Sequence, residues 1–118
     1  MRTYLGMHLT VDAECKGKEA LEDVSTLYEM LRSIPELIGM TPISPPFVVR
    51  YLDPPDEMWG WSGVVLIAES HISIHTFPEK KTFSFDCFSC KPFDKEKVIS
   101  YLEKTLKMID YNVQELAR

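Results

Sequence analysis

Residues 64 to 79 read Val-Val-Leu-Ile-Ala-Glu-Ser-His-Ile-Ser-Ile-His-Thr-Phe-Pro-Glu. The first five of these residues are continuously apolar, as expected of a central strand that is covered on both faces. From Ser70 the pattern alternates, which places both histidines on one face of a short strand and both isoleucines on the other. We therefore predict two strands joined by a tight turn at Glu69-Ser70, with Pro78 ending the second strand.

Three other segments have the alternation and the β-branched or aromatic residues of strands, namely residues 3–12, 47–52 and 83–90. In the last of these segments one face is mainly apolar and includes Cys87, whereas the other face is mixed polar and ends at Cys90. We expect Cys87 to pack in the core and Cys90 to lie on the polar face.

Two stretches instead repeat their apolar residues at three- and four-residue steps, which is the pattern of an amphipathic helix. The first begins at Lys18 and is ended or kinked at Pro35, because proline removes a backbone donor. The second runs over residues 95–109, with Asp94 as its N-cap. After it, residues 111–116 either add a short strand or fray.

This order of elements predicts an α+β fold, a two-layer sandwich in which a largely antiparallel β-sheet has its helices packed on one face. A proline-rich connector (39–46) precedes the strand at 47–52, and a surface loop is expected over residues 53–60. With 118 residues the chain fits a single domain, residues 1–118.

The composition excludes several classes of protein. A formal net charge of -5 argues against a nucleic-acid or anionic-membrane partner, because both require clustered cations. No apolar run is long enough to span a membrane, and the N-terminus lacks the apolar core of a signal peptide. We therefore expect a cytoplasmic protein, in which three cysteines argue against a disulfide framework.

The residues alone leave three interpretations of the central stretch open. The simplest is a hairpin whose polar side chains are only hydrogen-bonded. A second takes two pairs of side chains as zinc ligands, namely His71-x3-His75 and Cys87-x2-Cys90. An offset of three residues along a strand sends the two cysteines to opposite faces, so we expect no metal. The third treats Ser70 as a nucleophile, although it lacks the Gly-x-Ser-x-Gly turn of hydrolases.

Several motifs together resemble a known family. The most specific is Glu-Ser-His-x-x-x-His-Thr-x-Pro-Glu at residues 69–79. It is preceded by Trp-Ser-Gly-Val-Val (61–65) and followed by Phe-Asp-Cys-Phe-Ser-Cys (85–90), and the chain begins with Leu-Gly-x-His-Leu at 5–9. This pattern is similar to that of the short prokaryotic (class 1) S-adenosylmethionine decarboxylases, which are pyruvoyl-dependent enzymes made as self-cleaving proenzymes.

The resemblance implies a covalent rearrangement at Ser70. Its Oγ attacks the carbonyl of Glu69 and converts the peptide to an ester. Elimination and hydrolysis then free a β chain (1–69) and an α chain (70–118), whose first residue becomes a pyruvoyl group. Such a step needs a strained turn, a donor for the oxyanion and a base for the Cα proton.

The resemblance also assigns roles to other positions. Ser62 and His75 match the family's processing residues, with His75 counted among the catalytic residues. The pyruvoyl carbonyl takes the α-amine of S-adenosylmethionine as a Schiff base and acts as an electron sink, so that decarboxylated S-adenosylmethionine is made for spermidine and other polyamines. Cys90 aligns with the cysteine that returns a proton to the substrate carbon. Glu79 matches the position that binds the ribose hydroxyls.

Aromatic residues are the candidates for holding the adenine or the sulfonium, where a π-face attracts a cation. They are Phe47, Tyr51, Trp61 and, with them, Trp59. The family builds its sites between protomers, so the resemblance implies a homodimer of processed αβ units.

The sequence departs from the family pattern in three places. The connection before Trp59 is longer than usual, Phe77 stands where tryptophan is common, and Met7 stands where arginine is frequent. The altered connection leaves a basic amino acid, arginine or ornithine, as an alternative substrate. A non-catalytic relative that regulates a partner subunit is the alternative from another class.

Overall fold

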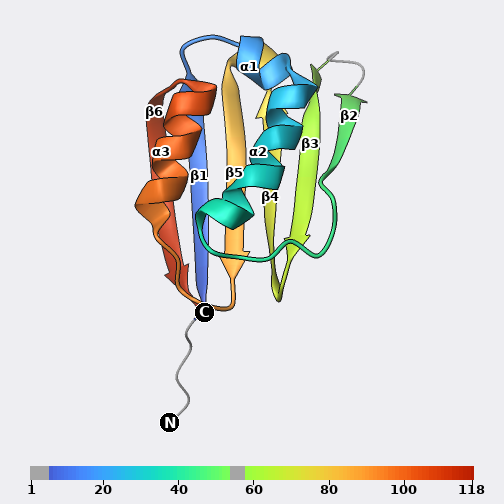
Figure 1. The fold of residues 1–118 in the computed structure, drawn as a ribbon. Coiled ribbons are helices and arrows are strands. Elements are labelled where there is room, and N and C mark those ends of the chain that lie inside the picture. The colour runs from blue at the N-terminus through green and yellow to red at the C-terminus, as the bar shows by residue number, and fades with distance from the viewer. Residues whose placement is uncertain (1–5, 54–57) are drawn as a thin grey trace.

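The computed structural model describes residues 6–53 and 58–118, and the elements of this part of the chain are shown in Figure 1. In chain order they are β1 (Met7–Cys15), α1 (Glu19–Glu22), α2 (Val24–Leu37), β2 (Phe47–Asp53), β3 (Met58–Ile67), β4 (Ser70–Phe77), the 3-10 turn η1 (Pro78–Lys80), β5 (Thr82–Ser89), α3 (Lys95–Leu106) and β6 (Met108–Ala117).

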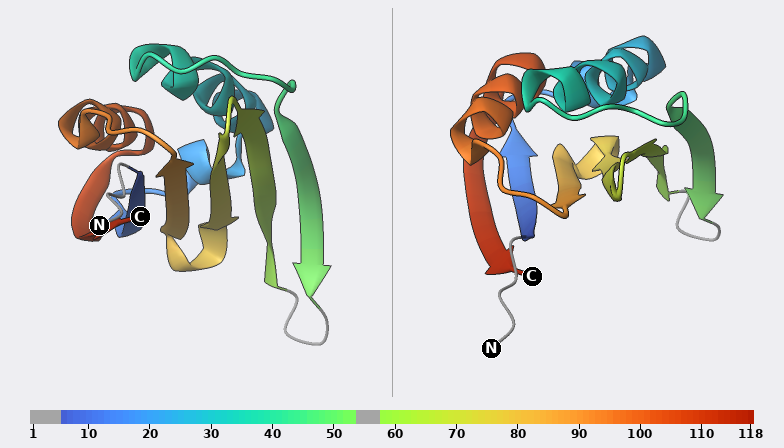
Figure 2. Two further views of the ribbon diagram at one scale, coloured as in Figure 1. Left: turned by 90° about the horizontal axis from the view of Figure 1, so that it is seen from below. Right: turned by 60° about the horizontal axis from the view of Figure 1, so that its bottom comes forward.

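The six strands form one sheet in the order β2-β3-β4-β5-β1-β6, and all neighbouring strands run antiparallel. The helices cover one face of this sheet, as Figure 2 shows from below. The predicted α+β sandwich is therefore confirmed. None of the helices in the described part of the chain is long and apolar enough to cross a membrane.

The core lies between the helices and one face of the sheet. Alternate residues of each inner strand point into it, as the twofold side-chain period of a strand requires. The helix side of the core is formed mainly by Leu27, Met30, Leu31 and Ile34 of α2, all fully buried. Burial of each such side chain contributes about 1.5–3 kcal/mol. The amphipathic pattern of the sequence thus determines which face of the sheet is covered.

The opposite face, which we call the open face, has no helix over it in the described part of the chain (Figure 2). It carries the histidines of β4, as predicted, together with polar and aromatic side chains of the neighbouring strands. Several apolar side chains near its β2 edge remain accessible, among them Phe47, Val49 and Leu66.

Three element boundaries differ from the predictions. The first helical stretch is divided at Asp23, whose carboxylate accepts a hydrogen bond from Ser25 N–H and so starts a new helix. Pro35 does not end α2, because it lies in the last turn and few backbone bonds follow it. The second helix ends at Leu106 and not at 109, since Lys107 adopts a left-handed conformation.

The remaining predictions concern strands. The alternatives for 111–116 are resolved as a strand, because β6 pairs along the length of β1. The loop expected over 53–60 is shorter, since β3 already begins at Met58. Residues 54–57 of that loop, and residues 3–5 of the first predicted strand, lie outside the described residues.

Candidate active site

A two-residue turn joins β3 to β4 at the lower end of the sheet in Figure 1. Ile67 pairs with Ser70 across it, so Ala68 and Glu69 form the loop. Glu69 has a φ of 63°, a left-handed conformation that costs a residue with a side chain about 1 kcal/mol. The predicted tight turn is therefore present, and its strain lies on the residue whose carbonyl belongs to the Glu69-Ser70 peptide bond.

Cys90, the residue after β5, contacts both sides of that peptide bond. Its backbone N–H donates to Ser70 Oγ at 3.0 Å, and its thiol donates to the carbonyl oxygen of Glu69 at 2.8 Å. Cys90 is exposed, so the thiol is accessible from solvent. The serine, the carbonyl and the cysteine named from the sequence are thus brought together by the ends of β4 and β5.

Ser62 and His75 form a second group on the open face. They are direct partners in the β3–β4 ladder, and Ser62 Oγ shares a hydrogen bond of 2.8 Å with His75 Nδ1. His75 is five residues from Ser70 along one strand, which corresponds to about 17 Å at 3.4 Å per residue. Within one chain the structure therefore does not bring this pair to the Glu69-Ser70 bond.

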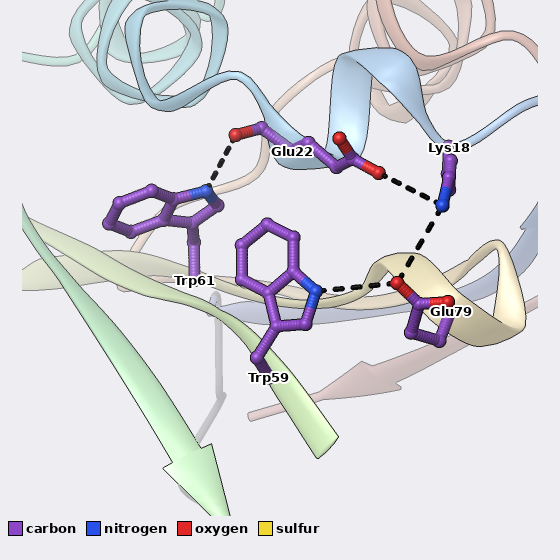
Figure 3. A network of polar contacts seen from close by, with 5 residues as sticks. All are labelled: Lys18, Glu22, Trp59, Trp61 and Glu79. Atoms are coloured by element: carbon purple, nitrogen blue, oxygen red, sulfur yellow. Dashed lines mark hydrogen bonds and ion pairs between the residues drawn. The ribbon is translucent and has the colours of Figure 1, made fainter. Parts of the chain in front are cut away.

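Glu79 belongs to a third group, shown in Figure 3. Its Oε1 accepts from Trp59 Nε1 at 3.4 Å and lies 3.7 Å from Lys18 Nζ. Lys18 also pairs with Glu22 at 3.6 Å. This group is on the helix side of the sheet, near α1, whereas Ser62 and His75 lie on the open face. Lys18 could not be identified from the sequence, because it is distant from Glu79 in the chain and belongs to no motif.

The aromatic candidates divide between the two faces of the sheet. Phe47 and Tyr51 lie on the open face, with Phe47 62% exposed and the Tyr51 ring edge-on to Phe77 at 6.5 Å. Trp61 points to the helix side, where its Nε1 donates to the carbonyl of Glu22 at 2.8 Å. The predicted binding roles of these residues remain predictions, but only Phe47 and Tyr51 share a face with His75.

Three aromatic and imidazole rings lie side by side on the open face near Ser70, and the sequence predicted no role for this group. Phe88 lies between His71 and His8, at centroid distances of 5.8 and 6.0 Å. His8 Nε2 is 2.9 Å from Asp86 Oδ1, and the guanidinium of Arg118 lies 4.4 Å from the Phe88 ring centroid. The alternation of β5 could have identified this face, since Asp86 and Phe88 share it with Cys90.

The other two cysteines lie in the core. Burial, with a smaller effect of Asp86, raises the pKa of Cys87 to about 12, and burial raises that of Cys15 to about 11. Cys87 is thus a packing residue, as predicted, on the face opposite to Cys90. In the described part of the chain, no three His, Cys, Asp or Glu side chains are grouped so that they could hold a metal ion.

Comparisons with known proteins agree with this arrangement. The family model described as S-adenosylmethionine decarboxylase matches residues 7–118. A protein of Clostridium botulinum (strain Loch Maree / Type A3) is 34% identical over 98% of this chain and 95% of its own length. One of Thermosipho melanesiensis is 35% identical over 97% of this chain and 84% of its own length. One of Pyrococcus furiosus is 30% identical over 97% of this chain and 78% of its own length.

All three relatives are named S-adenosylmethionine decarboxylase proenzyme. The family match includes every described residue that the sequence singled out, from His8 to Cys90. The relatives match almost the whole length of this chain, and the structure brings a serine and a cysteine to one peptide bond. This chain therefore belongs to the S-adenosylmethionine decarboxylase family, whose members depend on a pyruvoyl group formed from serine by self-cleavage.

Proposed function

We propose that this chain cleaves itself between Glu69 and Ser70 and then decarboxylates S-adenosylmethionine. The observation that carries the proposal is the pair of contacts that Cys90 makes across this peptide bond, in a turn where Glu69 is held left-handed. Backbone strain at a reactive bond lowers the cost of reaching the transition state, provided that the surroundings maintain it.

The first step forms the bond between Ser70 Oγ and the carbonyl carbon of Glu69 and breaks the bond from that carbon to Ser70 N, with the hydroxyl proton ending on the nitrogen. The thiol of Cys90 lies where negative charge develops on the carbonyl oxygen, so it can stabilise that charge. A base then removes the Ser70 Cα proton and the Cβ–Oγ bond breaks. Hydrolysis releases ammonia and leaves chains 1–69 and 70–118.

Cys90 would lie beside the pyruvoyl group that these steps form, because its N–H and thiol contact Ser70 Oγ and the Glu69 carbonyl oxygen, the two atoms that flank the Ser70 backbone before cleavage. When present, the group supplies an electron sink for the decarboxylation. Cys90 then holds a proton at Sγ that can be returned to the substrate carbon.

A homodimer would complete the site. Ser62 and His75 are needed as processing residues, but about 17 Å of β4 separates His75 from Ser70 in one chain. Both groups lie toward the open face, which none of the helices of residues 6–53 and 58–118 covers (Figure 2). Two copies related by a twofold axis and packed through this face can place His75 of one copy against Ser70 of the other.

The names of the relatives favour S-adenosylmethionine as the substrate, although the connection before Trp59 is longer than usual in the family. Relatives from three genera are named for S-adenosylmethionine, which favours this substrate over arginine or ornithine. Phe47 and Tyr51 on the open face are the candidates for stacking on the adenine. A regulatory relative without catalysis would not need Ser70 and Cys90 to converge. Cytoplasmic location stays a prediction.

Intact mass measurement tests the cleavage. We expect the wild-type protein to yield two chains that correspond to residues 1–69 and 70–118, whereas Ser70→Ala remains one chain. The processed protein should release labelled carbon dioxide from S-adenosylmethionine and not from arginine or ornithine. A wild-type protein that stays uncut after prolonged incubation would rule out the proposal.

Co-expression tests the shared site. A tagged His75→Ala chain keeps its own Ser70 but lacks the base, and a Ser70→Ala chain has the base but cannot be cut. With random pairing of equal amounts, about half of the His75→Ala chains should be cleaved, because about half of them occupy mixed dimers. No cleavage in the mixture, together with full cleavage of the wild type, would place the site within one chain.

A further inference from the structure

The connector between α2 and β2 contacts the last residues of β3, directly before the Glu69-Ser70 bond. Ala68 N–H donates to the Thr41 carbonyl at 2.9 Å, and Ile43 N–H donates to the Leu66 carbonyl at 2.9 Å. Between these bonds Pro42 forms an antiparallel bridge with Ile67. In Figure 1 this connector runs along the lower end of the sheet, beside the β3–β4 turn.

The sequence explains why the connector takes this path. β2 begins at Phe47, which pairs with Val64, so the residues of β3 beyond Val64 have no β2 residue beside them. Pro45 and Pro46 carry no N–H and cannot extend the ladder. The Leu66 N–H is instead satisfied by the hydroxyl of Ser44, at 3.1 Å.

The connector is also anchored to β5, the strand that presents Cys90. Met40 is 6% exposed, and its sulfur accepts a hydrogen bond of 3.6 Å from the buried hydroxyl of Ser89. Ser89 immediately precedes Cys90. Residues 40–44, which we call the connector clamp, therefore contact the ends of both strands that hold the reacting groups.

We propose that the connector clamp is a positioning element for self-cleavage: it holds the carbonyl of Glu69 against Ser70 Oγ and Cys90. This inference rests on the proposed function. A left-handed Glu69 persists only if both arms of the turn are fixed, since a free arm would rotate and release the strain. The β4 arm is fixed because Ser70 pairs with Ile67. The β3 arm is fixed because residues 66–68 are bonded to the connector clamp.

The clamp also has a task after the peptide bond breaks. Glu69 then ends the β chain, and the covalent link that kept Ala68 close to β4 is gone. The bonds from residues 66 and 68 to the clamp lie within the β chain, so cleavage does not remove them. They keep the new chain end in place beside the group formed from Ser70.

The test measures self-cleavage of freshly translated proenzyme, followed by intact mass. Ser44→Ala removes the hydroxyl acceptor and should slow cleavage about two- to tenfold, and Ser44→Thr should restore it. Ile43→Pro removes the N–H donor and should slow cleavage at least about tenfold. Ile43→Ala is its matched control, because the side chain is 64% exposed and its N–H remains.

A second measurement separates positioning from loss of fold. Thermal melting of each variant, in a Ser70→Ala background that cannot cleave, should stay far above the assay temperature. Hydroxylamine cleaves esters, so it reports the ester formed in the first step, and this ester should decrease in Ser44→Ala and Ile43→Pro. Folded variants that cleave at the wild-type rate would overturn the positioning role of the connector clamp but not self-cleavage. A wild-type protein that stays uncut would overturn the proposed function.

Discussion

Glu69 is the residue whose left-handed backbone supplies the strain in the self-cleavage that we propose. Three residues other than glycine have a positive φ in the described chain, namely Glu69, Lys81 and Lys107. Lys81 and Lys107 end a 3-10 turn and a helix, where a left-handed residue is common. Glu69 alone of the three adjoins the Glu69-Ser70 peptide bond, whose carbonyl oxygen accepts from the Cys90 thiol while the Ser70 hydroxyl accepts from the Cys90 N–H.

Glycine at these positions should separate strain from function. Lys107→Gly should raise the free energy of unfolding by up to about 1 kcal/mol, because glycine adopts φ > 0 without a steric cost. Glu69→Gly should give a similar gain but slow self-cleavage about fivefold, since the strain is released. Urea unfolding and intact mass measure the two effects. Equal cleavage rates for wild type and Glu69→Gly would contradict the role of strain.

The buried thiols predict a pH dependence of stability. Burial raises the pKa of Cys87 to about 12 and of Cys15 to about 11, so the fold favours the neutral thiol. Their contribution is complete below the pKa of the unfolded thiol, about 8.5, and is lost as pH rises toward these values. Urea midpoints of Ser70→Ala protein should therefore fall above about pH 9. In a Cys87→Ala variant the decline should be smaller, and an equal decline would be contrary to the prediction.

At this scale the sequence identified the residue types but not all of their neighbours. Ser62, Ser70, His75 and Cys90 were named from the family motif, and strand alternation predicted the faces of His75 and Cys90. The hydrogen bond between Ser62 and His75 was not predicted. The contact of Glu79 with Lys18 was not predictable, because it joins η1 to the start of α1 across 61 residues of chain. Its geometry depends on packing of the whole layer.

At the scale of elements, periodicity predicted five of the six strands and both helical stretches and left residues 111–116 open, whereas the ends of the elements were set by local contacts. The carboxylate of Asp23 divides the first helix by capping a new one. β3 extends further toward its N-terminus than its composition indicates, because Gly60 and Trp61 pair with Tyr51 and Arg50 of β2. Tertiary pairing thus overrides weak local propensity at a loop boundary.

Two glycines of β3 should respond differently to alanine. A Cβ at Gly60 would collide with the backbone carbonyl oxygen of Thr76, which cannot move without disturbing the sheet. A Cβ at Gly63 would come within 2.7 Å of Leu31 Cδ1, the flexible end of a side chain. We expect Gly60→Ala to lower the free energy of unfolding by about 3 kcal/mol and Gly63→Ala by about 1. Urea titration measures both, and the reverse order would be inconsistent with this geometry.

At the scale of the whole molecule, the open face is the feature that a single chain leaves incomplete. The twelve residues from Ala68 to Glu79 suggested one crowded site, but an extended strand spreads them along the sheet and over both of its faces. Alternation predicted which side chains share a face. It carries no argument for the second copy that we propose, which rests on the distance along β4 and on the one-sided arrangement of the helices (Figure 2).

Charge on the open face should therefore disrupt assembly. Val49 pairs with Ser62 on that face and is 42% exposed. Val49→Glu should shift the protein from dimer to monomer in light scattering and reduce self-cleavage. Leu52→Glu is the control, because Leu52 is 57% exposed on the same strand but faces the other way. Dimers that persist in Val49→Glu would argue against this interface.

The position of β1 in the sheet has a consequence for how the mature enzyme comes apart. β1 is bonded to β5 on one side and to β6 on the other, so the strand of the proposed β chain is enclosed by strands of the α chain. Because β3 of the β chain also pairs with β4 of the α chain, the two fragments can dissociate only by breaking three ladders. Renaturation then requires an encounter between separate molecules. Folding of the uncut Ser70→Ala chain before it dimerises should be independent of concentration, whereas even this chain-level step should follow second-order kinetics for the cut form.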